Sequence, residues 1–437
     1  MVNQLFNKNQ IEQTGEPHRM SVLLFFNCCF ALVSLCLMFL PIAQGYLAGN
    51  YYSILMIGTM GGWFVTAVCV DRRWLSRLLP TAALMILLVL FYAVLVVFGF
   101  GNIRGVATAV LPSYYSFFVA YFYYVTGNKR TLATIGIVMF LAFGITMLTT
   151  VVGLADNPYL YRESGGIITS LVNLRQNIGL VHHIYSAVLI AALLGCFLKA
   201  RDITCKPVKI VAWVLFVFCV YIGLTCSSAI ALLCAVLVLV YYPLQDKPVV
   251  IQVGVVAIAL ILFLFLADPV AKWIQDISRG IENEYISSKL YDIGRSLLGN
   301  SATGEVAART DRWMIDFSAF LGSYGMGIGP YYTGGGNGTF VITDHSQLFA
   351  DLGRYGIAFF VFTCILFLSY CKLLKKMLRE SGMKCNLNAF YLIFLIMYIS
   401  QPTMTNYIIP MIFFFFVPAS IQIVSRVNTR LGKTQVE

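Results

Sequence analysis

The sequence predicts an all-α polytopic membrane protein with about twelve transmembrane helices and one large extracytoplasmic loop. The chain has 437 residues, of which 59% are hydrophobic and 11% are charged, whereas about a quarter of the residues in a soluble domain carry charge. Apolar runs long enough for a helix to cross a bilayer recur along the chain. One long polar segment, 268–346, interrupts them and must lie outside the hydrocarbon region.

The apolar runs divide the chain into three parts. Residues 1–267 carry nine predicted spans and an outer loop at 154–181, residues 268–346 form the polar segment, and residues 347–437 carry three spans and a tail. The first run follows about 20 polar residues and is too long for a typical signal peptide, so we expect a retained helix. The predicted spans are 21–42, 47–70, 79–100, 106–127, 131–153, 182–198, 208–226, 228–244, 248–267, 355–371, 388–405 and 407–425.

Basic residues predict the orientation of these spans. With the N-terminus in the cytoplasm, twenty of the 30 Lys and Arg residues fall in cytoplasmic segments, for example at 72–77, 199–209 and 372–384. Cytoplasmic loops carry such an excess of bases. We therefore expect a multi-pass membrane protein with both termini in the cytoplasm and the polar segment on the outer side of the membrane.

Charge and cysteine content argue against several other classes of protein. The net charge of +11 follows from the cytoplasmic excess of bases and does not indicate a nucleic-acid partner. Ten of the 12 cysteines fall in or beside predicted spans, and no Cys-x-x-Cys occurs, so we interpret them as small buried apolar residues. No cluster of metal ligands stands out, and we predict neither a metal nor a cofactor.

The outer loop at 154–181 holds the first candidate site residue. Apolar residues recur every three or four positions from Ile167 to Ile178, which predicts an amphipathic helix over 167–180 at the membrane interface. Arg175 lies beside this stripe, either as an interfacial arginine or as a ligand for a lipid-linked phosphate. His182 and His183 begin the next span and are supporting candidates.

The polar segment begins with a second amphipathic pattern. Asp268 and Pro269 suit a helix start, and apolar residues then recur from Val270 to Leu297, which predicts one or two helices along the membrane face. Farther on, seven glycines crowd a short stretch, and we expect flexible backbone there. These glycines are Gly325, Gly327, Gly329, Gly334, Gly335, Gly336 and Gly338.

A short helix between these two stretches carries the strongest candidates. Arg309, Arg312 and Trp313 share one helix face, because residues three and four apart are neighbours. Two guanidinium groups beside an aromatic ring suit a bound phosphate. Arg312 and Asp316 could instead form an ion pair, which would leave Arg309 as the freer cation; an exposed face of salt bridges is the simpler alternative.

His345 ends the polar segment where the chain re-enters the membrane. An imidazole can take a proton from a hydroxyl group near neutral pH. Asp344 or Asp351 could orient it, and the sequence does not choose between them.

These features resemble the bacterial O-antigen polymerase and O-antigen ligase superfamily, whose members are called Wzy-like and WaaL-like. The shared features are the late periplasmic loop and two short motifs. The first motif is Arg309-x-x-x-Trp313 followed by Gly327-x-Gly329, and the second is His345-Ser346 followed by Gly353-x-x-Gly356. The chain departs from the family at Ser227-Ser228, where many members have Ser-Arg, so it has no arginine at that point to contact the donor phosphate.

The resemblance implies an inverting, metal-independent glycosyltransferase with a GT-C-type fold. The donor would be a glycan on undecaprenyl pyrophosphate, and the acceptor a lipid-linked repeat unit in a polymerase or the lipid A–core in a ligase. His345 would be the base, and Arg175, Arg309 and Arg312 would hold the pyrophosphate, with Asp344 and Trp313 in support. The resemblance favours a polymerase and leaves room for a partner protein that regulates chain length.

A transporter of lipid-linked oligosaccharides is the competing class of protein. Such a transporter is expected to carry charged residues within its spans and to have short loops. Here the spans are almost free of charge and one loop is long. These features favour an enzyme over a transporter, and the resemblance implies an enzyme of lipopolysaccharide biosynthesis.

Overall fold

The structure is a computed structural model, and it is helical throughout the residues that it describes. These are 22–47, 50–77, 79–97, 111–156, 167–226, 228–245, 247–248, 250–252, 254–255, 267–281, 287–288, 290–291, 294–295, 304–328, 346–403 and 407–434. Most of the predicted span at 248–267 lies outside this part of the chain, and so do Asp344 and His345.

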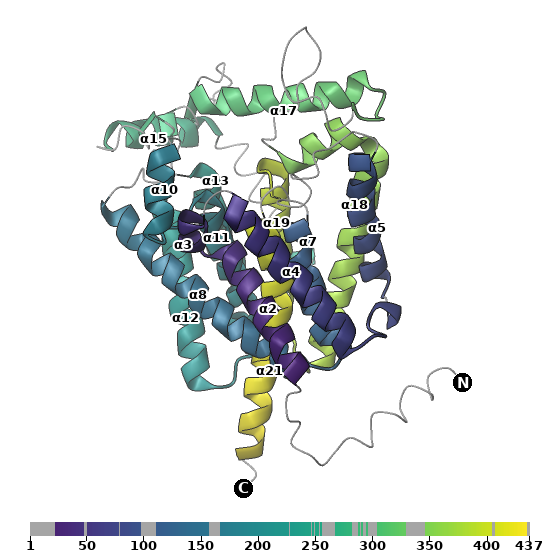
Figure 1. The fold of residues 1–437 in the computed structure, drawn as a ribbon. Helices are drawn as coiled ribbons and strands as arrows, with labels where there is room; N and C mark the ends of the chain where they lie inside the picture. The colour runs from purple at the N-terminus through teal and green to yellow at the C-terminus, as the bar shows by residue number, and fades with distance from the viewer. Residues whose placement is uncertain are drawn as a thin grey trace.

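The predicted spans other than 248–267 overlap helices that run side by side in one bundle (Figure 1). Seven helical segments of the described chain are long and apolar enough to cross a membrane, and three shorter apolar segments accompany them. A multi-pass membrane protein is therefore confirmed. The helices of the bundle are α2 (Val22–Phe39), α3 (Pro41–Tyr46), α4 (Asn50–Val70), α5 (Pro80–Val97), α7 (Leu111–Val125), α8 (Lys129–Asp156), α10 (Ile167–Arg175), α11 (Val181–Lys199), α12 (Lys206–Thr225), α13 (Ala229–Tyr241), α18 (Gln347–Glu380), α19 (Asn388–Ser400), α20 (Ile408–Met411) and α21 (Val417–Thr434), with short turns η1 (Leu75–Arg77) and η3 (Tyr242–Leu244).

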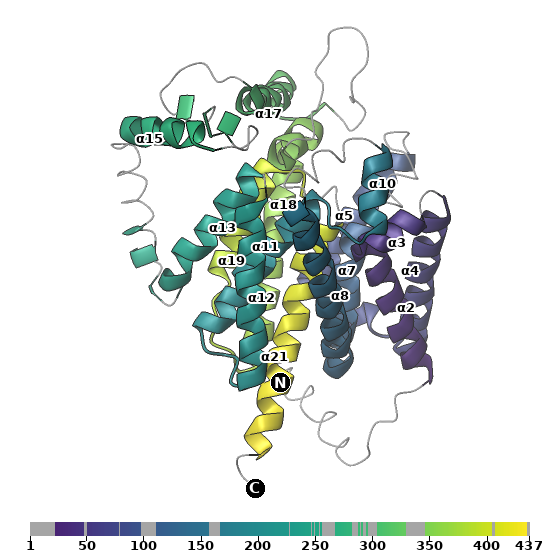
Figure 2. The ribbon, with the colours of Figure 1, turned by 90° about the vertical axis from the view of Figure 1, so that its left-hand side faces the viewer.

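The two ends of the bundle differ in what they carry. The end of α21 lies at one end, while α15 (Ala267–Arg279) and α17 (Gly304–Gly322) lie across the other, roughly at right angles to the bundle (Figures 1 and 2). The two helices of the polar segment therefore cap the bundle.

Basic turns gather at the end that α15 and α17 leave open. There Lys129 at the start of α8 pairs with Glu380 at the end of α18, with 3.5 Å between Nζ and the carboxylate. Asp202, after α11, accepts hydrogen bonds from the backbone N–H groups of Lys384 and Cys385. The basic turns and the helices of the polar segment thus lie at opposite ends of the bundle.

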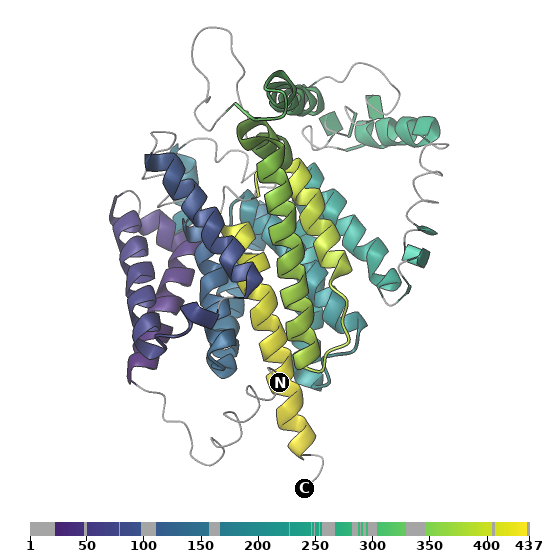
Figure 3. The ribbon, with the colours of Figure 1, turned by 90° about the vertical axis from the view of Figure 1, so that its right-hand side faces the viewer.

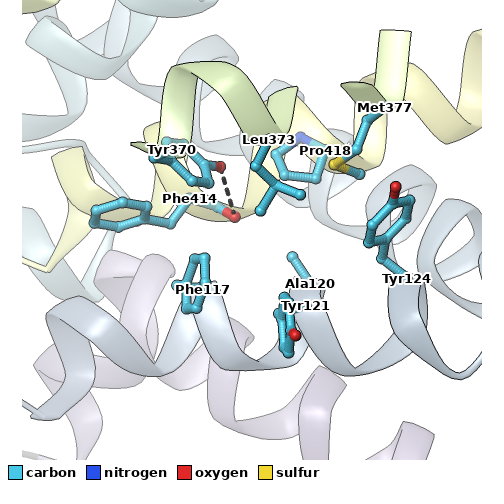
Figure 4. Close-up of a pocket in the computed structure, with 9 residues that line it drawn as sticks. All are labelled: Phe117, Ala120, Tyr121, Tyr124, Tyr370, Leu373, Met377, Phe414 and Pro418. Carbon is cyan, nitrogen blue, oxygen red and sulfur yellow. Dashed lines mark hydrogen bonds between the residues drawn. The ribbon is translucent and has the colours of Figure 1, made fainter. Parts of the chain in front are cut away.

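The middle of the bundle is filled by aromatic side chains around a π-helical turn in the last helix. Residues Ile412–Phe416 (η4) form a π-helical turn between α20 and α21. Pro418 has no N–H group to donate to the carbonyl group of Phe414. The Tyr370 hydroxyl donates instead to the carbonyl oxygens of Phe413, at 2.9 Å, and Phe414, at 3.4 Å (Figure 4).

The ring of Phe413 packs this π-helical turn against the neighbouring helices. Its centroid lies 4.3 Å from that of Phe394 and 5.4 Å from that of Phe367, and both pairs are stacked. Such aromatic pairs stabilise a core beyond the area that they bury. Pro418 is therefore accommodated within the last helix by the packing of Phe413 and by the hydroxyl group of Tyr370.

Helix α18 links this core to the cap. It begins eight residues before the predicted span at 355–371 and is broken at Gly356, whose φ of 75° and ψ of −172° are not helical. Figure 3 shows the bend, with the first part of α18 beneath α17 and the second part descending through the bundle. The first part therefore belongs to the cap and carries the residues that follow His345.

Candidate functional site

Helix α17 docks onto the first part of α18 through apolar side chains. The ring centroids of Trp313 and Phe349 are 5.9 Å apart, and those of Phe317 and Phe349 are 6.1 Å apart. Ala319 and Ala350 are buried side chains of one small apolar cluster. Trp313, predicted from sequence as a site residue, thus contacts a helix that begins two residues after His345.

The register of α17 separates the two candidate arginines. Asp316 and Ala319 are buried on the face that carries Trp313, whereas Arg312 is exposed. Since successive residues turn by about 100°, position 309 falls in the middle of the buried face and Arg312 at its edge. The side chain of Arg309 lies outside the described part of the structure, and the ion pair between Arg312 and Asp316 stays a prediction.

The glycines of the two motifs meet backbone to backbone. The N–H of Ile328 donates to the carbonyl of Gly353 at 2.8 Å, and the N–H of Ile357 donates to that of Gly325 at 2.9 Å. A Cβ atom at Gly356 would lie 2.5 Å from the carbonyl of Gly325. A Cβ at Gly327, whose φ is 82°, would lie 2.5 Å from the backbone of the kink in α18.

This contact corrects one sequence-based expectation. We expected the glycine-rich stretch to be flexible, but Gly325 and Gly327 are fixed by hydrogen bonds and by close packing against α18. Only glycine tolerates a positive φ and so close an approach without strain. The expectation for the later glycines, from Gly329 to Gly338, falls outside the described residues.

The residue that follows His345 anchors the start of α18. Ser346 is fully buried, and its hydroxyl accepts a hydrogen bond from the N–H of Phe349 and donates one to the carbonyl of Ile399. The N–H of Gln347 donates to the carbonyl of Gln401 at 3.1 Å. The start of α18, which directly follows position 345, is therefore held against the end of α19.

The first part of α18 also carries a buried carboxylate, Asp351, whose partners could not be predicted from the sequence. Asp351 is 4% exposed, and its oxygens accept hydrogen bonds from Gln347 at 2.9 Å and from the Tyr398 hydroxyl at 2.8 Å. Tyr398 belongs to α19 and could not be placed by spacing along the chain. Asp351 therefore ties the first part of α18 to α19, while its contact with His345 stays a prediction.

Arg175 is held at the same end of the bundle by α3. Its Nε donates to the carbonyl of Gly45 at 3.3 Å, and its guanidinium lies 5.6 Å from the ring centre of Tyr46. The helix predicted over 167–180 ends at Arg175, because Asn177 takes a positive φ of 59° that closes the helix. Helix α10 stands on α3 along the bundle, and the structure describes no contact that joins Arg175 to α17 (Figure 2).

The two histidines of α11 differ in their surroundings. His183 is fully buried, with one ring nitrogen accepting from the N–H of Leu180 and the other 2.8 Å from the carbonyl of Phe39. Both nitrogens thus serve to fix the start of α11. His182 is half-buried, and its Nδ1 has no hydrogen-bond partner among the described residues.

Known proteins add nothing to this geometry, since neither a family model nor a curated protein matches the chain. The site as described consists of an aromatic and glycine-mediated contact between α17 and α18. This contact brings the first motif close to the start of the second. It also leaves the Trp313 indole N–H buried without a partner among the described residues, which suits a site where a further polar group binds.

Proposed function

We propose that this protein is a membrane glycosyltransferase that polymerises a surface polysaccharide. It transfers a growing glycan from undecaprenyl pyrophosphate to a lipid-linked repeat unit at the face covered by α17. The observation that carries this proposal is the docking of α17 on α18, in which Trp313 contacts Phe349, a residue of the helix that begins two residues after His345.

The chemistry follows from the residue types in this arrangement. His345 takes the proton of the acceptor hydroxyl, and the oxygen attacks the anomeric carbon of the donor sugar. The bond from that carbon to the pyrophosphate oxygen breaks, so the configuration inverts and the pyrophosphate leaves with the bonding electrons. Arg309 and Arg312 stabilise the charge that develops on it, since a guanidinium presents paired donors to phosphate oxygens.

The position at the membrane face supports a lipid-linked substrate. Helices α15 and α17 lie across the end of the apolar bundle (Figure 1), and Trp273 on α15 is exposed, as an interfacial tryptophan would be. A polyprenol in the bilayer could then place its pyrophosphate at the level of α17. In this proposal the site faces the periplasm, and the membrane is the bacterial inner membrane.

Purified full-length protein with lipid-linked repeat units tests this proposal. We expect longer glycans to form in the presence of a metal chelator, and we expect Arg309→Ala, Arg309→Lys and His345→Ala each to abolish extension. Arg279→Ala, an exposed arginine of α15 paired with Asp276, is the matched control and should extend normally.

Two results would contradict the proposal. Wild-type glycan lengths from His345→Ala and Arg309→Ala would remove both residues from the mechanism. Transfer of preformed polymer to lipid A–core, without extension of repeat units, would identify a ligase instead.

A further inference from the structure

A hollow lined by basic side chains opens at the end of the bundle opposite α17. Its larger part encloses about 370 Å³ between the end of α11, the turn after η3 and the loop before α19. An adjoining part of about 330 Å³ faces α12, and Lys199 and Arg201 line both. We call this the basic hollow, and its bases are Lys199, Arg201, Lys209, Lys247 and Lys384.

No acidic side chain lines the basic hollow among the residues that the structure describes. The neighbouring Asp202 is buried, and its two oxygens accept backbone N–H groups of Lys384 and Cys385 at 3.0 and 2.8 Å. That carboxylate therefore anchors a loop. Five cationic side chains gathered on one concave surface create a positive potential that attracts an anion.

Arg201 occupies a backbone position that normally belongs to glycine. The end of α11 is closed by hydrogen bonds from the N–H of Arg201 to Leu198 and from the N–H of Asp202 to Phe197, and Arg201 has a φ of 57°. Glycine is the usual residue at this point of such a helix end. An arginine here is strained, and strained residues gather where a side chain has a task beyond folding.

Gln245 provides an observation independent of the charges. Its side chain lines the basic hollow and is 8% exposed. Its Nε2 donates to the sulfur of Cys196 at 3.2 Å, while its Oε1 is buried and has no partner among the described residues. A buried carbonyl oxygen costs free energy unless it accepts a hydrogen bond, so the ligand should carry a hydrogen-bond donor, such as a hydroxyl group, as well as negative charge.

The side of the hollow formed by α12 resembles a lipid-binding surface. Trp213 and Tyr242 lie at its rim with ring centroids 5.7 Å apart, and such residues favour the headgroup region of a membrane. Beyond them Ile210, Val214 and Val217 are each about 60% exposed along one face of α12. An acyl chain can lie along this apolar face while its headgroup enters the hollow.

We propose that the basic hollow binds the headgroup of an anionic phospholipid of the phosphoglycerol type. The bases hold the phosphate, Gln245 accepts a hydrogen bond from a glycerol hydroxyl, and the acyl chains lie along α12. Basic pockets between transmembrane helices are suited to such headgroups. This inference is independent of the glycosyltransferase proposal, because the two sites lie at opposite ends of the bundle.

Titration of the full-length protein in neutral detergent with short-chain phosphatidylglycerol tests the inference, with bound lipid counted by native mass spectrometry. We expect Arg201→Gly/Lys209→Gln to weaken binding by about 30-fold, since each basic residue near a membrane surface contributes about a factor of five to anionic lipid binding. Arg72→Gly/Arg73→Gln is the matched control, with the same loss of charge in an exposed turn elsewhere on this end, and it should bind as the wild type does.

Two further arms separate the alternatives. Arg201→Gly alone should weaken lipid binding while leaving the melting temperature unchanged or higher, because glycine relieves the strain at φ 57°. Soluble glycerol phosphate should fail to displace the lipid, since it lacks the contact along α12. Equal loss of binding in the two double variants would overturn the site, and displacement by glycerol phosphate would overturn the assignment to a lipid.

Discussion

The contact between the two glycine motifs can be tested at Gly356. An alanine there would have to adopt a φ of 75° and a ψ of −172°, a region populated almost only by glycine that costs about 1–3 kcal/mol for other residues. Its Cβ would also lie 2.5 Å from the backbone of Gly325 and Met326, and overpacking of this kind costs about 1–3 kcal/mol. Together these effects oppose docking of the segment around Gly325 by about 4 kcal/mol.

Hydrogen exchange in the detergent-purified protein measures this opening directly. The N–H groups of Ile328 and Ile357 are bonded across the contact, and a change of about 4 kcal/mol raises their exchange about a thousandfold. Gly144→Ala in α8, where an added Cβ meets nothing within 4 Å, is the control and should leave both rates unchanged. Wild-type exchange at Ile328 and Ile357 in Gly356→Ala would refute the account of the two motifs as an interlocked backbone contact.

Three further substitutions test the contacts around the candidate site. Trp313→Phe should keep the ring contact with Phe349 and lower thermal stability only slightly, because the indole N–H has no partner among the described residues. Loss of glycan extension at normal stability would show that this N–H contacts the substrate. Loss of stability would show that it has a partner within the protein. His183→Ala should destabilise the protein by about 2–4 kcal/mol, since it removes two buried hydrogen bonds and a ring, and an unchanged melting temperature would contradict this structural role. Asp351→Ala should destabilise by a similar amount of about 2–4 kcal/mol, because it removes the acceptor that Gln347 and Tyr398 share. Tyr398→Phe removes one hydrogen bond and should cost about 1 kcal/mol, and an unchanged melting temperature in Tyr398→Phe would show that Asp351 does not stabilise the contact between α18 and α19.

The sequence by itself determined that this chain is a helical membrane protein. Long apolar runs can satisfy their backbone groups in a bilayer only as helices, so the positions of α2, α4, α8, α11 and α12 could be predicted from local composition. The same argument placed α15 and α17 in a separate polar segment. Helix register also predicted that position 309 and Trp313 share a face, because this relation depends only on spacing along one helix.

Only the tertiary structure decided how distant segments meet. Pairing of Gly327 with the kink at Gly356 and of Asp351 with Tyr398 joins residues about 30 to 50 positions apart, and no local pattern specifies such partners. The sequence predicted a flexible backbone at Gly325 and Gly327, because glycine has a large conformational freedom in an isolated chain. Close packing against α18 fixes both residues. In the sequence, the bases of the hollow appeared only as part of an excess of Lys and Arg in loops predicted to be cytoplasmic. Folding converted that excess into one concave surface, because the turns after α11 and η3 and before α19 lie together at the same end of the bundle.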